Sequence, residues 1–251
     1  MSSSLRARRR RLVLITAVSG AAAVLASTIA LTGTSGGPSA KEAPAASSSS
    51  SSSTAVPDER EASLLALARR KDGDPLAKGK ADAPVVMIVY SDFQCPFCGK
   101  FARETEPELV REYVDKGVLR IEWRNFPVFG DESERAARAA WAAGRQGRFW
   151  QFHDVVFGKP RERDRGQFSA ARLRDMAREA GVADLDRFST DMESEGANEA
   201  VREDQEEGYG LGVSSTPAFL VNTTPILGAQ PLTAFSVAIE KAAEEAGEAA
   251  R

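Results

Sequence analysis

The sequence has very little histidine and cysteine for its length. Among its 251 residues there is one histidine, His153, and there are two cysteines, Cys95 and Cys98. A histidine-rich metal site within one chain is therefore excluded, and a serine–histidine–aspartate site could use only His153. Two cysteines also exclude a small scaffold held together by many disulfides. The net charge of −3 gives no reason to expect nucleic-acid binding.

What remains is the composition of a globular protein with an uneven distribution of charge. Hydrophobic residues make up 42% of the chain and charged residues 27%, which excludes a wholly disordered or collagen-like protein. The length suits one sizeable domain, or one domain with appendages. Residues 1–11 contain five arginines and no acidic residue, so we expect a basic cytoplasmic tip on an acidic, soluble body.

An uncharged stretch, Leu12 to Leu31, follows the arginines. As a helix it is long enough to cross about 30 Å of hydrocarbon. Its length favours an uncleaved signal-anchor, whereas its many small residues favour a secretory signal peptide that is removed. We expect a single-pass anchor in the cell membrane, with the N-terminus cytoplasmic and the rest of the chain extracytoplasmic. Cleavage would instead make the protein secreted.

Residues 32–73 have the composition of a flexible linker. They are rich in Ser, Ala, Gly and Pro and include a run of serines from Ser47 to Ser53. Such a segment has too little apolar surface to offset the entropy of ordering. Asp58 to Lys71 could form a short amphipathic helix at best, and we expect the folded part to begin near Asp74.

The two cysteines form a C-x-x-C motif, Cys95-Pro96-Phe97-Cys98. Before it, the apolar, β-branched run 85–90 predicts a buried strand, and 91–94 predicts a turn. After it, a helical pattern runs as far as Tyr113, in which Pro107 should produce a kink. The motif is therefore predicted between a strand and a helix, with Pro96 in the first helical turn.

This position has a chemical consequence. A helix N-terminus offers unpaired N–H groups and a partial positive charge, which stabilise the thiolate, the nucleophilic form of cysteine. We assign Cys95 as the attacking nucleophile and Cys98 as the residue that resolves the mixed disulfide. Two alternatives remain open: a zinc half-site completed by a second copy of the chain, and a purely structural disulfide. We assign no metal and no cofactor.

Other segments agree with a redox motif. The motif and the phenylalanine and glutamine before it, together with three further segments, resemble the DsbA-like family of thioredoxin-fold thiol–disulfide oxidoreductases, most of all its membrane-tethered Gram-positive and actinobacterial members. The three further segments are Gly212 to Asn222, Gly228 to Pro231 and Phe149 to Asp154. The resemblance covers about Asp74 to Ala246. It implies an α/β thioredoxin-like fold in two parts, 74–130 and 212–247, with an inserted all-helical domain at 131–211.

The resemblance also implies a cis bond between Thr216 and Pro217, in a loop that lies against Cys95. The backbone of Thr216 could then pair with an extended substrate peptide. The alternative is an ordinary proline that enters a strand. Two departures from the family are visible: Phe97 stands where the best-known members have His, and 222–225 replaces an Asn-Gly turn.

The remaining pattern predicts the rest of the fold. A strand is predicted at Val118–Arg124, and 131–211 is helical in pattern. Two short strands follow at Ala218–Val221 and Pro225–Gly228, and a last helix at about Leu232 to Ala246.

A few residues outside the motif could carry chemistry. We expect His153 and the three tryptophans to have packing roles. The acidic run 203–207 is predicted to be a solvated helix face. Glu122, on the second predicted strand, could be a buried carboxylate that moves protons to Cys98 if its side chain points that way.

The predicted function is that of an extracytoplasmic thiol–disulfide oxidoreductase that introduces disulfides into other proteins through a Cys95/Cys98 cycle. Pro96, Phe97, Thr216 and Pro217 are the predicted supporting residues. Expected partners are reduced, unfolded proteins and, from the resemblance, a quinone-linked membrane reoxidase; we expect a monomer. The alternatives are a reductase or isomerase on the same fold, and a peptide-binding or chaperone module without redox turnover.

Overall fold

The structure is a computed structural model that describes residues 59–160 and 162–249. These residues belong to one compact unit, 52–251. The predictions for the basic tip, the membrane segment and the linker as far as residue 58 lie outside the described residues. None of the described helices is long and apolar enough to cross a membrane.

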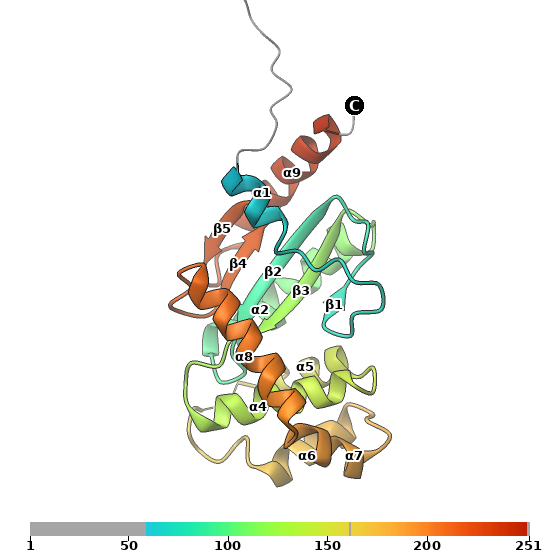
Figure 1. Cartoon of the computed structure of the whole chain (residues 1–251), viewed down its shortest axis with the longest axis vertical. Coiled ribbons are helices and arrows are strands. Elements are labelled where there is room, and N and C mark those ends of the chain that lie inside the picture. Colours follow the sequence, from blue (N-terminus) through green and yellow to red (C-terminus); the bar gives the residue numbers. More distant parts are fainter. Residues whose placement is uncertain (1–58, 161, 250–251) are drawn as a thin grey trace, which may run out of the picture. The chain divides into compact units, whose positions relative to one another are not determined.

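A mixed five-stranded sheet forms the centre of this unit (Figure 1). The strands are β1 (Ala77–Lys78), β2 (Val85–Ser91), β3 (Leu119–Asn125), β4 (Ala218–Val221) and β5 (Thr224–Leu227). Their order in the sheet is β1-β3-β2-β4-β5. β2 and β3 run parallel, and the other neighbours are antiparallel. Each strand predicted from the sequence is present within one residue of its expected ends.

The central strand β2 is buried along its whole length because both faces of the sheet are covered. Val85, Met87 and Val89 point into the larger core, together with both cysteines. Val86, Ile88 and Tyr90 point to the opposite face and pack in a second, smaller cluster. A strand covered on both sides is apolar at every position, which is the pattern that predicted it.

The chain crosses from β2 to the parallel strand β3 through a helical segment in three pieces. These are α2 (Pro96–Glu104), α3 (Glu106–Leu109) and the π-helix η1 (Val110–Val114). The interruption at Thr105 precedes Pro107, whose ring removes one N–H donor from the helix. The predicted kink is therefore confirmed.

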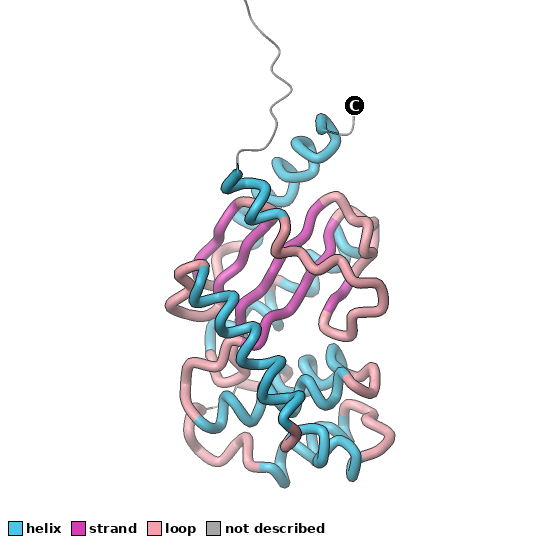
Figure 2. The backbone as a smooth tube through the Cα atoms, in the orientation of Figure 1, coloured by secondary structure: helices cyan, strands magenta, loops and turns pink. Residues whose placement is uncertain are grey.

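Between β3 and β4 the described elements are all helices (Figure 2). They are α4 (Asp131–Gly144), α5 (Phe149–Phe157), α6 (Ala170–Glu179), α7 (Leu185–Met192) and α8 (Glu195–Gly210). α4 contacts all four others, and six of its alanines are buried, which lets the neighbouring helices approach it closely. The last helix, α9 (Leu232–Ala249), packs on β2 and β4.

The start of the folded part differs from the prediction. Helix α1 (Glu59–Leu65) and the segment after it are described, and the backbone amides of Arg69 and Arg70 donate to the Glu122 carboxylate at 2.9 and 2.8 Å. These residues lie within the predicted linker. The composition could not show their order, because the partner that fixes them is more than fifty positions away in the sequence.

Candidate active site

Cys95 is the N-cap residue of α2, directly after β2 and its turn. Pro96 begins the helix, as predicted, and the Cys98 amide donates to the Cys95 sulfur at 3.4 Å. Both cysteines are free thiols, and both are buried, with Cys98 only 1% exposed. The burial of the Cys98 sulfur argues against a zinc half-site shared between two copies of the chain, which would need both sulfurs at the surface.

The two thiols have opposite acid–base properties. The hydrogen bond from the Cys98 thiol, the Thr216 side chain and the amides of Cys98 and Phe97 together outweigh burial and lower the pKa of Cys95 to about 6. Burial and the neighbouring Cys95 raise the pKa of Cys98 well above its ordinary value. At neutral pH the arrangement therefore holds a thiolate at Cys95 and a thiol at Cys98.

The loop between α8 and β4 lies against Cys95. The peptide bond between Thr216 and Pro217 is cis, which confirms the prediction. The Cys95 thiol donates to the Thr216 carbonyl at 3.2 Å. The buried Thr216 hydroxyl has no hydrogen-bond partner of good geometry among the described residues, so it can turn toward the sulfur when Cys95 loses its proton.

Phe97 is 63% exposed at the surface beside the motif. Its side chain cannot donate a hydrogen bond to sulfur, but its backbone N–H contributes to the lowered pKa of Cys95. The helix terminus therefore takes part of the role that a polar side chain could have at this position.

The turn before Cys95 contains two buried polar residues whose roles were not predicted. The Asp92 carboxylate accepts hydrogen bonds from the amides of Gln94 and Val128 and from the Ser133 hydroxyl, each at 2.7 Å. Burial raises the pKa of Asp92, although these hydrogen bonds oppose it. The Gln94 side chain donates to Ser133 at 3.0 Å and accepts from the Asp164 amide at 2.9 Å. The nucleophile is thus fixed to α4 and to the loop after α5.

Glu122 does not serve Cys98. Its neighbours in β3, Ile121 and Trp123, pack in the core with the cysteines, so the Glu122 side chain points to the opposite face of the sheet. There it accepts from Arg120 at 2.9 Å and from Arg124 at 3.2 Å. Burial alone would raise the pKa of Glu122, but these partners and the two backbone amides lower it overall. The predicted proton transfer is wrong.

The acidic run 203–207 is not a purely solvated face either. Asp204 is 2% exposed and accepts from Arg69 at 2.7 Å and from the Asn125 amide at 2.8 Å. Glu207 accepts from Arg124 at 2.8 Å. Hydrogen bonds and ion pairs of this run therefore connect α8 to β3, and some of the charges involved are buried.

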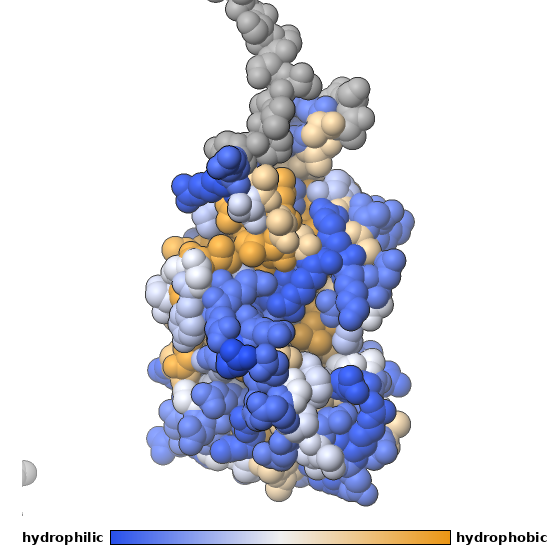
Figure 3. All heavy atoms as spheres, in the orientation of Figure 1, coloured by the Kyte–Doolittle hydropathy of each residue, from blue (hydrophilic) through white to orange (hydrophobic). Residues whose placement is uncertain are grey.

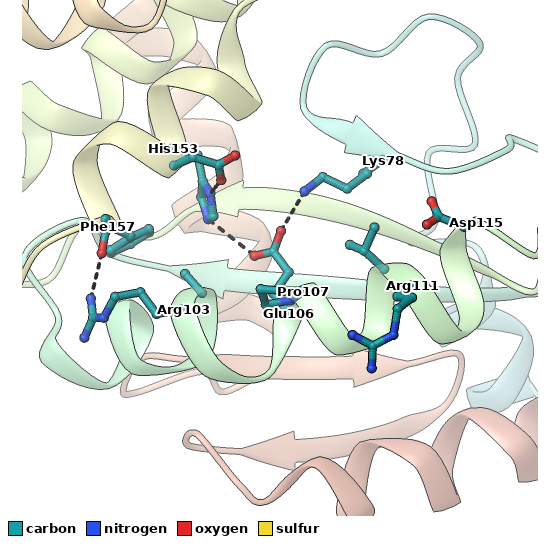
Figure 4. A pocket seen from close by; sticks show the side chains of 12 residues that line it. Lys78, Arg103, Glu106, Pro107, Arg111, Asp115, His153 and Phe157 are labelled. Atoms are coloured by element: carbon teal, nitrogen blue, oxygen red, sulfur yellow. Dashed lines mark hydrogen bonds and ion pairs between the residues drawn. The ribbon is translucent and has the colours of Figure 1, made fainter.

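His153 is buried among aromatic rings, including Trp123, as its predicted packing role requires. It also has polar neighbours at the edge of a cavity of about 400 Å³ (Figure 4). Its Nδ1 lies 2.9 Å from Asp154, and its Nε2 lies 3.5 Å from a Glu106 oxygen. Lys78 donates to the other Glu106 oxygen at 2.9 Å. Over 59–160 and 162–249, no group of acidic, histidine or cysteine side chains is placed to hold a metal ion.

The chain resembles known proteins, and one family model covers the whole of this site. The thioredoxin family model matches residues 71–241. A probable disulfide bond formation protein D from Bacillus anthracis is 31% identical over 147 residues, 57% of this chain and 68% of that protein.

Solved structures show the same architecture. The oxidised BdbD of Bacillus subtilis is 25% identical, with a TM-score of 0.64 over 68% of this chain and 94% of that one. A thioredoxin-like oxidoreductase from Silicibacter pomeroyi is also 25% identical, with a TM-score of 0.61 over 72% and 96% of the two chains. The chain therefore belongs to the thioredoxin family, as a DsbA-like thiol–disulfide oxidoreductase.

Proposed function

We propose that this protein is an extracytoplasmic oxidant that introduces disulfides into secreted or membrane-exposed proteins. The observation that carries the proposal is the placement of Cys95 at the N-cap of α2, with the Cys98 amide donating to its sulfur and the cis Thr216–Pro217 loop against it. This placement lowers the pKa of Cys95 to about 6, beside a buried Cys98 whose pKa is raised. A stabilised Cys95 thiolate stabilises the reduced form of the pair. The disulfide form is then more readily reduced, which makes it the better oxidant of other thiols.

The cycle begins with the Cys95–Cys98 disulfide. A client thiolate attacks the Cys95 sulfur, the bond between the two protein sulfurs breaks, and its electron pair leaves on Cys98. Cys98 then takes up a proton, as its raised pKa favours. A second client thiolate attacks the client sulfur of the mixed disulfide and expels Cys95 as a thiolate, a good leaving group because of its low pKa. The client is released with a new disulfide, and the protein is left with Cys95 and Cys98 reduced, having gained two electrons.

The supporting residues have separate roles in this proposal. Pro96 sets the start of α2, so that the N–H groups of its first turn face the Cys95 sulfur. The backbone of Thr216 pairs with an extended client segment, and Pro217 offers no N–H that would compete for the sulfur. Phe97, mostly exposed, gives an apolar contact for an unfolded client.

The proposal also includes a location, argued from the N-terminal sequence, and partners, argued from the family resemblance. The uncharged stretch 12–31 would anchor the chain in the cell membrane with residues 1–11 in the cytoplasm, where arginines are retained. Residues 131–211 would form an inserted domain beside a monomeric thioredoxin fold. A quinone-linked membrane protein would remove the two electrons and restore the disulfide, because turnover needs an acceptor.

A redox titration of the full chain against glutathione tests the direction of the reaction. We expect a reduction potential well above that of cytosolic thioredoxin, about −270 mV; a value near that would reject the oxidant in favour of a reductase. The same protein should oxidise a reduced, denatured client. Undiminished biological activity of Cys95→Ser would instead support a peptide-binding module without redox turnover.

A further inference from the structure

A small pocket lies directly against the nucleophile, between α2 and the end of α5. Its volume is about 70 Å³, and Cys95, Phe157, Pro160, Arg103 and Lys159 are among the residues that line it. Ligand pockets begin at about 300 Å³, so this one has room for the end of a single side chain. Among the described residues that line it there are two cations and no acidic residue.

Arg103 is held in place in this pocket. Its Nη1 donates to the Phe157 carbonyl at 2.7 Å, a contact drawn in Figure 4. One turn earlier in α2, a Cβ on Gly99 would come within 2.8 Å of the same nitrogen, so glycine makes room for the guanidinium. A guanidinium has five N–H donors, and Arg103 forms no ion pair within 59–160 and 162–249.

Lys159 supplies the second charge from the other side. It is the second residue after α5, and its side chain is exposed. It has no ion pair in the described part of the chain, and it lines the pocket with Pro160. The loop that carries Lys159 continues to Asp164, whose amide is bound by Gln94, next to Cys95.

We propose that Arg103 and Lys159 form an anion subsite that takes an acidic side chain next to the reacting cysteine of a client. This inference rests on the proposed function, because it assigns a preference among clients of the same reaction. Thr216 and the pocket both lie against Cys95, so a client sulfur that attacks Cys95 beside Thr216 would bring a neighbouring client side chain to the pocket. A carboxylate there neutralises two unpaired cations, whereas a client lysine meets like charge.

The test uses the oxidised full chain and three dithiol peptides that differ only in the residues on both sides of the first cysteine, which are Asp, Asn or Lys. Reduction of the protein disulfide is followed by thiol alkylation. Each rate is divided by the rate of the same peptide with hydroxyethyl disulfide, which removes the effect of the charges on the peptide thiol itself. The normalised Asp-to-Lys ratio should be about threefold to tenfold at low salt. It should fall toward one at about 1 M salt.

Variants of the two cations test whether the pocket causes the preference for the Asp peptide. In the double variant Arg103→Gln/Lys159→Gln, the normalised Asp-to-Lys ratio should fall to about one. The matched control, Lys116→Gln/Arg202→Gln, removes the same charges from exposed positions outside the pocket and should keep the ratio. Lys159→Gln alone alters an exposed side chain, so it should lower the ratio even if the Arg103 variant fails to fold.

The outcomes separate the two proposals. Equal normalised rates for all three peptides, or a ratio unchanged in the pocket variants, would overturn the anion subsite while leaving the oxidant intact. If none of the peptides, the neutral one included, reduced the protein disulfide, the proposed function itself would fail.

Discussion

The two faces of the central sheet use polar chemistry in different ways. On the face that carries the cysteines, the core is aromatic and aliphatic, and the rings of Phe93, Trp123 and Phe157 all contact one another. On the opposite face, a small apolar cluster lies beside a network of buried charges centred on Glu122 and Arg124. In Figure 3 this second face shows hydrophilic side chains over α8 and an apolar area between α1 and α8.

The two faces therefore have different roles: the ion-pair network on one face stabilises the fold, and the thiol pair on the other face is reactive. The network joins α8, β3 and the segment after α1 through charges that are buried and paired. The thiol pair, by contrast, gains its asymmetry from burial and a few uncharged hydrogen bonds. The lowered pKa of Cys95 comes from the hydrogen bonds of the Cys98 thiol, the Thr216 side chain and the amides at the start of α2, and the ion pairs of the network contribute nothing to it.

The largest effect should come from the cysteine face. Cys95→Ser removes the nucleophile and should abolish oxidation of a reduced client. Cys98→Ser should also stop turnover, because Cys95 then has no partner with which to form the protein disulfide. With a client that already carries a disulfide, however, the Cys95 thiolate of this variant should attack one client sulfur, release the other as a thiolate, and remain in a mixed disulfide that no Cys98 thiol can break. Non-reducing gel electrophoresis after incubation with the client distinguishes the two variants. Turnover by Cys95→Ser would show that the assigned roles are wrong.

Glu122→Gln should affect the opposite face alone. It leaves Arg120 buried without its carboxylate and Arg124 with Glu207 alone, which should cost about 3 kcal/mol of unfolding free energy. Urea denaturation measures this loss, and the pKa of Cys95 should stay unchanged. The control Glu199→Gln breaks an exposed pair with Arg202 and should have no measurable effect. A shifted Cys95 pKa in Glu122→Gln would contradict the separation of the two faces.

The pH dependence of Cys95 reactivity tests the cysteine face more finely. The rate of alkylation by iodoacetamide follows the thiolate, so it should rise with pH, reach half its maximum near pH 6 and level off above. An unstructured peptide thiol has its midpoint near about 8.5. Cys98→Ala removes the largest contribution to the lowered pKa and should move the midpoint upward. A midpoint near 8.5 in the unaltered protein would remove the basis of the oxidant proposal.

Much of the scaffold could be predicted because local pattern and fold agree. Both faces of β2 are buried, and the six residues 85–90 that predicted it are all apolar or aromatic; β4 begins directly after Pro217. The strand pattern before the C-x-x-C motif and the helical pattern after it placed Cys95 at a helix start, where the structure has it.

In β3, burial on both faces is the reason that the sequence could not show which way each side chain points. All seven of its residues are buried, so there is no polar and apolar alternation to show which face Glu122 takes. The roles of Asp204 and Gln94 depend on partners such as Arg69 and Asp164 at long sequence separation. Such contacts are set by the fold and leave no local signal. A two-residue strand such as β1 is likewise too short to produce a pattern.

The smallest predicted effect concerns Phe97, which stands where the best-known family members have His and which is exposed beside the motif. Phe97→His would add a donor close to the Cys95 thiolate and should lower the pKa of Cys95 further. Because the side chain is 63% exposed, solvent screening should limit the change to about one unit, or about 1.4 kcal/mol. That corresponds to a rise of about 30 mV in reduction potential. Phe97→Leu, which adds no donor, should change neither value. Equal potentials for the two variants would mean that the helix N-terminus and Thr216 already stabilise the thiolate as far as this site allows.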